Sequence, residues 1–515
     1  MSLDKKKIKL AFSIIFLLEI FSLFSFLFPE LNSIFFVTIV LFVFIVSLKK
    51  IEYGLWFSFA ELIIGSKGYL FYIGIGGLSL SIRIGIWFFV MLAFFIKLSK
   101  LLKEKYYKDL VKRPSYILEI LQNFLKSTYY LKYFFVLFLF ILYSLIVAFI
   151  SGNDNKNIFF DFNAWMFLSY IFPVYFAYHL KRNDLANLYS IIIGALSWVS
   201  FKTFFLLYIF SHNIISILPA VYSWVRKSGV GEITRMDSGF SRIFFQSHIY
   251  FIPLFIFLVS ISLYYFINNK YKKSVLFKFL YFSSIVSLSI NLITLSRSNW
   301  VGVVLSLALI FLFVLIFFKI KKTVLSFILI ASMFMFSVGL ISLIVKFPFP
   351  DPSAEFSTSG LLSERAKQIS SEAGVSSRWS LLKPLISEIG NHPIMGSGFG
   401  STVTYVSSDP RVLEMSPSGE YTTYAFEWGW LDIWLKFGFF GLLFYLYLLF
   451  KIFIFPFSKK MKPNNINSVF IYSMAIGLFA LSAVNFFSPY FNHPLGIAYL
   501  ILISIIFDRE LLNND

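Results

Sequence analysis

Apolar runs of about 20 residues recur from one end of this 515-residue chain to the other, and each is long enough to cross the roughly 30 Å hydrocarbon core of a bilayer as an α-helix. A typical run, residues 134–150, reads FFVLFLFILYSLIVAFI. It lacks the alternation of apolar and polar residues that marks the strands of a membrane β-barrel. Hydrophobic residues make up 58% of the chain, against about 45–50% in soluble domains. The sequence therefore predicts an all-α, polytopic transmembrane helical bundle.

The positions of these runs predict about 12 to 14 spans and three regions of the chain. We expect a transmembrane helical region over residues 1–345, a large extracytoplasmic loop over 346–427 and C-terminal transmembrane helices over 428–515. The run at 53–66 is short for a span and carries Glu61. The expected spans lie near 10–28, 33–48, 53–66, 79–97, 132–150, 161–179, 187–210, 246–267, 275–295, 299–318, 323–346, 428–455, 467–487 and 491–507.

The formal net charge of +19 comes largely from lysines and arginines that gather in every second connection between the expected spans. This is the positive-inside pattern, so it predicts that these connections and both termini lie in the cytoplasm, and that the protein resides in the inner (cytoplasmic) membrane. Because the charge is explained in this way, we expect no nucleic-acid partner. The basic connections contain Lys49 and Lys50, Lys100 to Arg113, Lys181 and Arg182, Lys270 to Lys273, Lys319 to Lys322, and Lys459 to Lys462.

Three connections are too long to be simple turns. Residues 101–130 combine lysines with apolar residues at roughly helical spacing, which predicts a cytoplasmic amphipathic helix resting on membrane lipids. Two other segments, 211–245 and 346–426, face the outer side under the charge rule. Within the larger one we expect helices at 363–371 and 378–388 and loops at 348–359 and 391–401.

The chain has no cysteine, so no disulfide can hold its loops and no thiolate can act as a nucleophile or metal ligand. It also lacks a cluster of histidines and carboxylates at metal-ligand spacing, and we expect no metal and no cofactor. The sequence GSGFG at 396–400 follows no expected strand, so it predicts a tight turn and not a dinucleotide-binding loop. Glu61 and Arg83 both lie inside expected spans and are expected to pair with each other.

Arginines on the outer side run against the positive-inside bias and so need a reason. Arg242, Arg297 and Arg378 fall on that side, as does Glu427 where the large loop re-enters the bilayer. A guanidinium is a planar fork that grips phosphate in a bidentate fashion, and several of them could hold a lipid diphosphate and stabilise the charge that develops as it leaves. Glu427 has aromatic neighbours that would bury it and suit it to act as a general base.

Each of these residues also has a structural alternative. A single outer arginine at the end of a span is usually an interfacial anchor that reaches to lipid headgroups, and a single glutamate is usually solvated or caps a helix. His248 and Trp300 complete the candidate substrate-binding set. A lone histidine, however, is more often satisfied by local hydrogen bonds.

Three segments resemble the O-antigen ligase and O-antigen polymerase superfamily. NLITLSRSNWVGVV, from Asn291 to Val304, resembles that family's Thr-x-Ser-Arg segment, and the SSRWSLLKPLISEIGNHPIMGSGFG stretch is similar to its Arg–Trp helix with the following glycine turn. The re-entry segment EWGWLDIWLKFGFFGLLFYL is similar to the family signature of a His-Asn pair, nine residues and Gly-x-x-Gly. Gly438 and Gly441 match those glycines, and Glu427 stands where histidine is usual.

The resemblance implies a metal-independent, inverting glycosyltransferase with a GT-C-like helical membrane fold, found in bacteria. Its donor would be an undecaprenyl-diphosphate-linked glycan at the outer face. Its acceptor would be a lipid A core sugar in a ligase, or another lipid-linked repeat unit in a polymerase. A chain-length regulator is a further candidate partner. Carried over by position, Arg297 and Arg378 would bind the donor diphosphate, and Glu427 would be the catalytic base.

Two other functions are compatible with a polytopic chain. A flippase for lipid-linked oligosaccharides would carry cations inside its spans, lining a central cavity, and would need no large outer loop. A glycosyltransferase that uses a polyprenyl phosphate carrying one sugar usually has acidic residues in its first outer loop, where this chain has only Glu30. The outer arginines and the large loop favour the diphosphate-dependent transferase.

Overall fold

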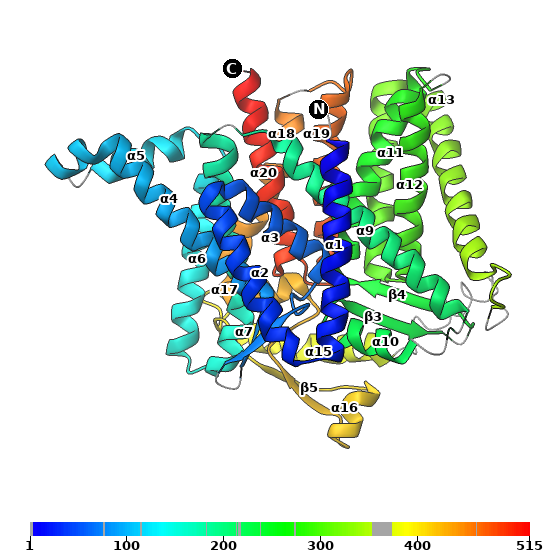
Figure 1. Cartoon of the computed structure of the whole chain (residues 1–515), viewed down its shortest axis with the longest axis horizontal. Helices are drawn as coiled ribbons and strands as arrows, with labels where there is room; N and C mark the ends of the chain where they lie inside the picture. The colour runs from blue at the N-terminus through cyan, green and yellow to red at the C-terminus, as the bar shows by residue number, and fades with distance from the viewer. Residues whose placement is uncertain are drawn as a thin grey trace.

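The computed structural model describes residues 4–75, 78–113, 116–181, 183–212, 214, 218–236, 238–271, 274–352, 373–459 and 461–514. In this part of the chain, 12 helices are long and apolar enough to cross a membrane. They run side by side to form one helical bundle (Figure 1). The predicted all-α, multi-pass membrane fold is confirmed.

The helices that could span a membrane follow the expected runs closely. Six of them bury fewer than half of their residues and leave apolar residues such as Val304 and Phe327 on the outside, as lipid-facing helices do. They comprise α1 (Lys5–Leu27), α2 (Glu30–Lys49), the first part of α4 (Ile82–Lys112), α6 (Leu131–Ile150), the run from α7 (Asn155–Met166) through η1 (Phe167–Tyr170) and α8 (Ile171–Tyr175) to η2 (Phe176–Leu180), α9 (Leu185–Ser211), η3 (Gln246–Tyr250) with α11 (Phe251–Ile267), α12 (Val275–Ile293), two halves of α13 (Arg297–Val345), α17 (Gly429–Phe453) and α19 (Ile466–Val484).

Two further expected spans are helices that fall outside this set. The first, α3 (Ile51–Gly65), has only 15 residues, and the second is α20 (Pro494–Asn514). Both lie inside the bundle, where residues such as Leu55, Leu62 and Ile501 are fully buried. An apolar sequence suits a helix that other helices enclose as well as one that lipid surrounds.

The helix α13 doubles back on itself and so supplies two of the membrane-length helices. The rings of Phe311 and Phe327 lie 5.9 Å apart, although a straight helix would separate them by about 24 Å. The turn falls in the basic segment around Lys322, whose ammonium donates to the carbonyl of Ile267 at the end of α11 (2.8 Å). The two expected spans at 299–318 and 323–346 are therefore confirmed as separate passes.

One face of the bundle carries both termini (Figure 1). On the same face, α4 continues to Lys112 and is followed by α5 (Tyr116–Lys126), which projects sideways from the bundle (Figure 1). These two helices account for residues 101–112 and 116–126 of the segment 101–130, for which an amphipathic helix was expected. The short helix α18 (Phe455–Ser458) also lies at this face.

The opposite face carries small elements that the sequence did not predict. Three antiparallel hairpins form there or just beneath it: β1 (Tyr72–Ile75) with β2 (Leu78–Ser81), β3 (Gly231–Arg235) with β4 (Ser241–Phe245), and β5 (Val403–Val406) with β6 (Glu420–Thr423). The helices α10 (Leu218–Lys227), α15 (Ala373–Asn391) and α16 (Pro410–Met415) lie with them (Figure 1). We call this side the hairpin face.

Within the large loop, the expected helix at 378–388 lies inside α15, and the expected loop at 391–401 is a series of turns. The expected helix at 363–371 and most of the expected loop at 348–359 lie outside the described residues. The division of the chain at 345 and 428 stays a prediction.

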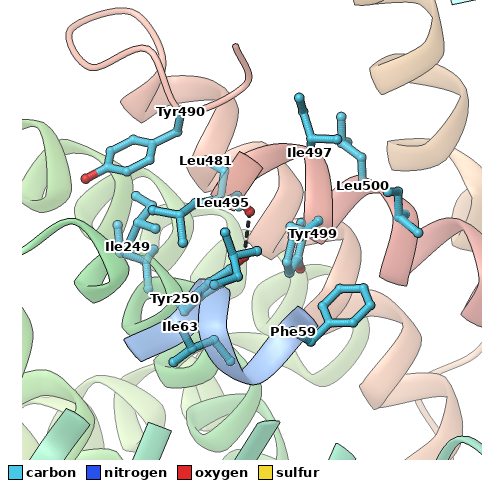
Figure 2. Packing of buried hydrophobic residues seen from close by; sticks show 14 of the residues in the cluster. Phe59, Ile63, Ile249, Tyr250, Leu481, Tyr490, Leu495, Ile497, Tyr499 and Leu500 are labelled. Carbon is cyan, nitrogen blue, oxygen red and sulfur yellow. Dashed lines mark hydrogen bonds between the residues drawn. The ribbon is translucent and has the colours of Figure 1, made fainter. Parts of the chain in front are cut away.

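A buried cluster beneath the hairpin face joins helices that are far apart in sequence. Figure 2 shows Phe59 and Ile63 of α3 beside Ile249 and Tyr250 of η3, together with residues of α19 and α20. The Tyr250 hydroxyl donates to the carbonyl of Leu495, at 2.7 Å. This packing fixes the connector between α19 and α20, residues 485–493, against the centre of the bundle.

Candidate functional site

A glycine-rich turn at 392–400 is wedged into the bundle. Gly396, Gly398 and Gly400 all have positive φ, which favours glycine. A Cβ added to Gly398 would lie 2.4 Å from the backbone nitrogen of Ala148 in α6. The Asn153 amide group donates to the carbonyls at 397 and 399, at 2.9 and 2.8 Å. The expected tight turn is confirmed, and it locks the large loop onto the membrane helices.

The same turn meets a kink in α17. Gly438 has φ 72°, and a Cβ there would lie 2.1 Å from the carbonyl oxygen of Ile394. The Phe439 amide donates to the carbonyl of Pro393 (3.0 Å), and the Ser397 amide donates to the carbonyl of Leu435 (2.6 Å). The close approach of the two backbones explains why glycine stands at 438 and fixes the first turns of α17 in place.

Those first turns carry a buried ionic cluster. The ammonium of Lys436 lies 2.5 Å from a carboxylate oxygen of Asp432, one turn earlier in α17, and 2.7 Å from one of Asp161 in α7. Asp161 also accepts from the Gly400 amide (2.9 Å), and Asp432 accepts from the Asn492 amide group. These side chains are nearly inaccessible to solvent, so the single positive charge of Lys436 compensates the two carboxylates where water cannot.

A cavity of about 350 Å³ opens beside this ionic cluster. Its volume lies at the lower end of the range for small-molecule pockets. Side chains from α4, α7, α17 and the 485–493 connector meet there, with the 424–426 segment on one side. The polar lining consists of Lys67, Tyr69, Ser81, Arg83, Asp161, Asn163, Gln246, Tyr424, Asp432, Lys436, Asn492 and His493, and the apolar lining includes Trp87, Phe160 and Phe426.

A second ion pair borders the cavity. Arg83 donates to both carboxylate oxygens of Glu61, at 2.9 and 3.1 Å, so the expected pairing of these residues is confirmed. Burial, with help from the positive charges of Arg83 and Lys67, lowers the pKa of His493 to about 3. The imidazole is therefore neutral at physiological pH. Among the described residues that line the cavity, Lys67 is the one cation without a carboxylate partner.

Arg378 and Glu427, two of the expected catalytic residues, are in direct contact. The Arg378 guanidinium donates to the Glu427 carboxylate, and their side chains are 35% and 51% exposed. The Trp428 indole donates to the Arg378 carbonyl (2.9 Å), which ties α15 to the start of α17. The expectation that aromatic neighbours bury Glu427 is wrong. The Phe426 side chain points into the protein, whereas the next side chain, Glu427, points to the surface of the hairpin face.

Arg242 and Arg297 lie at neighbouring points of the hairpin face. Arg242 of β4 donates to the carbonyl of Thr294 (2.7 Å), just before the start of α13, and its guanidinium lies 5.1 Å from the Phe244 ring. Arg297 is the first residue of α13 and is half-buried. The hydrogen bond from β4 therefore brings two arginines that are 55 residues apart to the same edge of the bundle.

His248 and Trp300 make structural contacts. His248 is fully buried. Its Nε2 lies 2.8 Å from the Thr203 hydroxyl, and its Nδ1 accepts from the Phe245 amide at 3.2 Å. The Trp300 indole donates to the carbonyl of Asn291 (3.3 Å). Neither residue lines the cavity, so the alternative of local hydrogen bonding describes His248 better than a substrate contact does.

The 485–493 connector links the separate parts of this face. Phe487 packs on Trp428, with ring centroids 5.7 Å apart, and so approaches the Arg378–Glu427 pair. Ser488 shares a hydrogen bond of 3.0 Å with Ser298, next to Arg297. Asn492 reaches the cavity. The Arg378–Glu427 pair, Arg297 and the cavity therefore all lie near one connector. Phe426 lines the cavity and Glu427 does not, so the 424–428 segment separates Glu427 from the cavity.

The sequence did not single out the ionic cluster, although a signal was present. Asp432 and Lys436 stand one helical turn apart inside an expected span, and charged residues within a membrane helix mark a candidate site by default. Asp161, at the start of another expected span, carries the same signal. Nothing in the sequence shows that the three residues meet, because they come from α7 and α17.

The O-antigen ligase family model matches residues 282–446, a segment that contains Arg297, Arg378 and Glu427 as well as Asp432 and Lys436. No curated protein matches the chain. The family match over residues 282–446 confirms the resemblance to the O-antigen ligase and polymerase superfamily.

Proposed function

We propose that this protein transfers a glycan from an undecaprenyl-diphosphate-linked donor to a hydroxyl group of a second glycan-bearing lipid. The reaction would take place at the hairpin face, on the outer side of the bacterial inner membrane, with both termini in the cytoplasm. The match to the O-antigen ligase family over residues 282–446 is the observation that carries this proposal. The gathering of three arginines and a glutamate on the hairpin face supports it.

Arg297 and Arg378 are the proposed diphosphate ligands, with Arg242 beside Arg297. Their guanidinium groups would pair with phosphate oxygens and stabilise the charge that builds up on the leaving diphosphate. Such pairing needs no metal, because the cations come from the protein. The side chain of Arg378 is about a third exposed and so is accessible to a donor that arrives from the bilayer edge.

Glu427 is the proposed base. In the resting protein its carboxylate is held by Arg378. A bound diphosphate would compete for that guanidinium, and Glu427 would then be free to accept a proton. The acceptor oxygen would attack the anomeric carbon from the side opposite the diphosphate, the bond to the diphosphate oxygen would break, and the hydroxyl proton would pass to Glu427. This sequence inverts the anomeric centre.

Replacement of Glu427 by glutamine tests this assignment. In a reconstituted transfer assay, Glu427→Gln is expected to lower turnover by about 100-fold or more, as loss of a general base typically does, while donor binding persists. Glu420→Gln is the matched control, because Glu420 lies exposed in β6 of the same loop. Full activity in Glu427→Gln would place the base elsewhere, and Asp432→Asn would then be the next variant.

The acceptor decides between two activities that share this chemistry. A second lipid-linked repeat unit would make the protein a polymerase, which could work with a chain-length regulator, and a lipid A core sugar would make it a ligase. A product that grows as a ladder of lengths would identify the polymerase. A single addition would identify the ligase.

One observation favours a second class, a flippase for lipid-linked oligosaccharides. Lys67, Arg83 and Lys436 line a cavity between helices, as the positive groups of a flippase would. Two of these cations are already paired with carboxylates, however, which leaves little charge for a diphosphate. In cells, Arg297→Ala should cause repeat units to accumulate on the outer face if the protein is a transferase, and accumulation on the cytoplasmic face would indicate a flippase.

A further inference from the structure

The cavity beside the Asp161–Lys436–Asp432 cluster contains polar groups that have no partner in the part of the chain that the structure describes. The side chains of Asn163 and Gln246 line it and make no hydrogen bond there. The Asn492 side chain is 9% exposed and donates to Asp432, but its carbonyl oxygen accepts no hydrogen bond. A buried amide oxygen without a partner, as in Asn492, is uncommon because leaving it unsatisfied is unfavourable, and the half-buried amides of Asn163 and Gln246 are accessible from the cavity.

Two phenols add to this set. Tyr69 and Tyr424 line the cavity, and burial raises the pKa of each hydroxyl, so both remain protonated and able to donate. Neither hydroxyl has a hydrogen-bond partner among the described residues. The cavity therefore offers several half-buried amide and hydroxyl groups, each able to donate and accept.

The fixed charges of the lining nearly cancel. Arg83 is paired with Glu61, Lys436 lies between two carboxylates, and Lys67 adds one further positive charge. A strongly anionic ligand would meet the carboxylates of Asp161 and Asp432, and a cation would meet the ammonium of Lys436. This balance favours a ligand that is neutral and rich in hydroxyl groups.

Aromatic side chains complete the lining. Trp87 is held in place by a hydrogen bond of 2.7 Å from its indole to the Ser169 hydroxyl, and Phe160 and Phe426 present further rings. A sugar ring carries hydroxyl groups around its edge and C–H groups on its faces. Amides and phenols match the edge, and aromatic rings match the faces.

We propose that this cavity is a binding site for a neutral sugar unit of the lipid-linked glycan, recognised through Asn163, Gln246 and Asn492. The inference rests on the proposed function for the identity of the glycan, but the site is distinct from the arginines assigned to the diphosphate. Phe426 faces the cavity while its neighbour Glu427 pairs with Arg378, so the sugar site and the diphosphate site adjoin along one segment.

Separate binding measurements on the full-length protein in lipid nanodiscs test the proposal. One probe is the lipid-free oligosaccharide released by mild acid from the lipid-linked repeat unit, and the other is undecaprenyl diphosphate without sugar. The double variant Asn163→Ala/Gln246→Ala should weaken oligosaccharide binding by about tenfold, as the loss of two hydrogen bonds typically does, and leave undecaprenyl diphosphate binding unchanged. Arg297→Ala should do the reverse.

A matched control uses two amides far from the cavity, Gln122→Ala/Asn467→Ala, which lie in α5 and α19. This variant should bind both probes as the wild type does, and thermal unfolding should show that each variant is folded. If undecaprenyl diphosphate binds the wild type but the oligosaccharide does not, or if the cavity variant binds the oligosaccharide normally, the sugar site is refuted. Failure of the wild type to bind undecaprenyl diphosphate would instead refute the proposed function.

Competition between the probes and the intact donor identifies the source of the sugar. If saturation with the intact lipid-linked donor displaces the oligosaccharide, the cavity holds a sugar of the donor. If the oligosaccharide stays bound, the cavity holds a sugar of the acceptor. Either result supports a sugar site, provided that the double variant loses oligosaccharide binding.

Discussion

Lys436→Met is expected to destabilise the protein far more than a surface substitution does. The side chain of Lys436 is 3% exposed, and its ammonium lies 2.5 Å from a carboxylate oxygen of Asp432 and 2.7 Å from one of Asp161. Methionine keeps most of the side-chain volume but removes the only cation between two buried carboxylates. Removing one partner of a buried ion pair typically costs about 3–5 kcal/mol, because the remaining charge is left uncompensated. We therefore expect a loss of about 3–5 kcal/mol in the free energy of unfolding.

Neutralising the two carboxylates should restore part of this loss. In the triple variant Lys436→Met/Asp161→Asn/Asp432→Asn no uncompensated charge remains, and the two introduced asparagine side chains can still accept from the Gly400 amide and the Asn492 side chain. Replacing buried ion pairs by neutral groups is often close to neutral for stability. We expect the triple variant to be at least about 2 kcal/mol more stable than Lys436→Met alone.

Equilibrium unfolding in mixed micelles, followed by far-UV circular dichroism, measures these differences. Lys451→Met is the matched control, because Lys451 lies in the same helix beside Tyr447 and has no carboxylate partner among the described residues. Lys451→Met should change the free energy of unfolding by no more than about 0.5 kcal/mol, as most surface substitutions do. If Lys436→Met is no more destabilising than Lys451→Met, Lys436 is not the buried counter-ion that we describe.

Three further predictions concern the arginines, the glycine turn and the cavity histidine. Arg297→Lys should lower transfer by about tenfold or more in the reconstituted assay, since an ammonium cannot replace a bidentate fork; wild-type rates would argue against diphosphate contact. Gly398→Ala should destabilise the protein by about 2–4 kcal/mol through strain and collision with α6, whereas Gly152→Ala, also at positive φ but with open space around it, should lose only about 1 kcal/mol; equal losses in thermal unfolding would contradict the close packing. Burial, together with Arg83 and Lys67, lowers the pKa of His493 to about 3, below the usual value of about 6.5, so the unfolded chain binds the extra proton and stability should fall as pH drops from about 6.5 toward 3. His493→Asn keeps an acceptor for the Leu495 amide and should flatten this slope; an unchanged slope would exclude His493 as its source.

The sequence was sufficient to predict the membrane fold, because the signal for a spanning helix is local. Each run of about 20 apolar residues reports its own length and hydropathy, and 12 helices of that kind are present in the described residues. The same signal could not distinguish helices that face lipid from helices such as α3 and α20 that other helices enclose, since both kinds are apolar. That distinction depends on tertiary packing.

Some residues of the candidate site could likewise be predicted from local sequence, and others could not. The outer arginines and Glu427 were visible because they break the charge pattern around them, and the contact of Arg378 with Glu427 joins two of them. The ionic cluster was missed because Asp161 and Lys436 are 275 residues apart and meet only through α7 and α17. The expected burial of Glu427 was wrong because aromatic neighbours in sequence do not determine which way a side chain faces.

Whether a new glycosidic bond forms is the most direct test of the proposed function. Purified wild-type protein in nanodiscs would be mixed with the lipid-linked repeat unit and a chelator of divalent metals, and the glycan product and free undecaprenyl diphosphate would both be quantified. We predict one undecaprenyl diphosphate released for each new linkage, with both lost in Glu427→Gln. Movement of the intact lipid-linked unit across a bilayer without any bond formation would contradict a transferase.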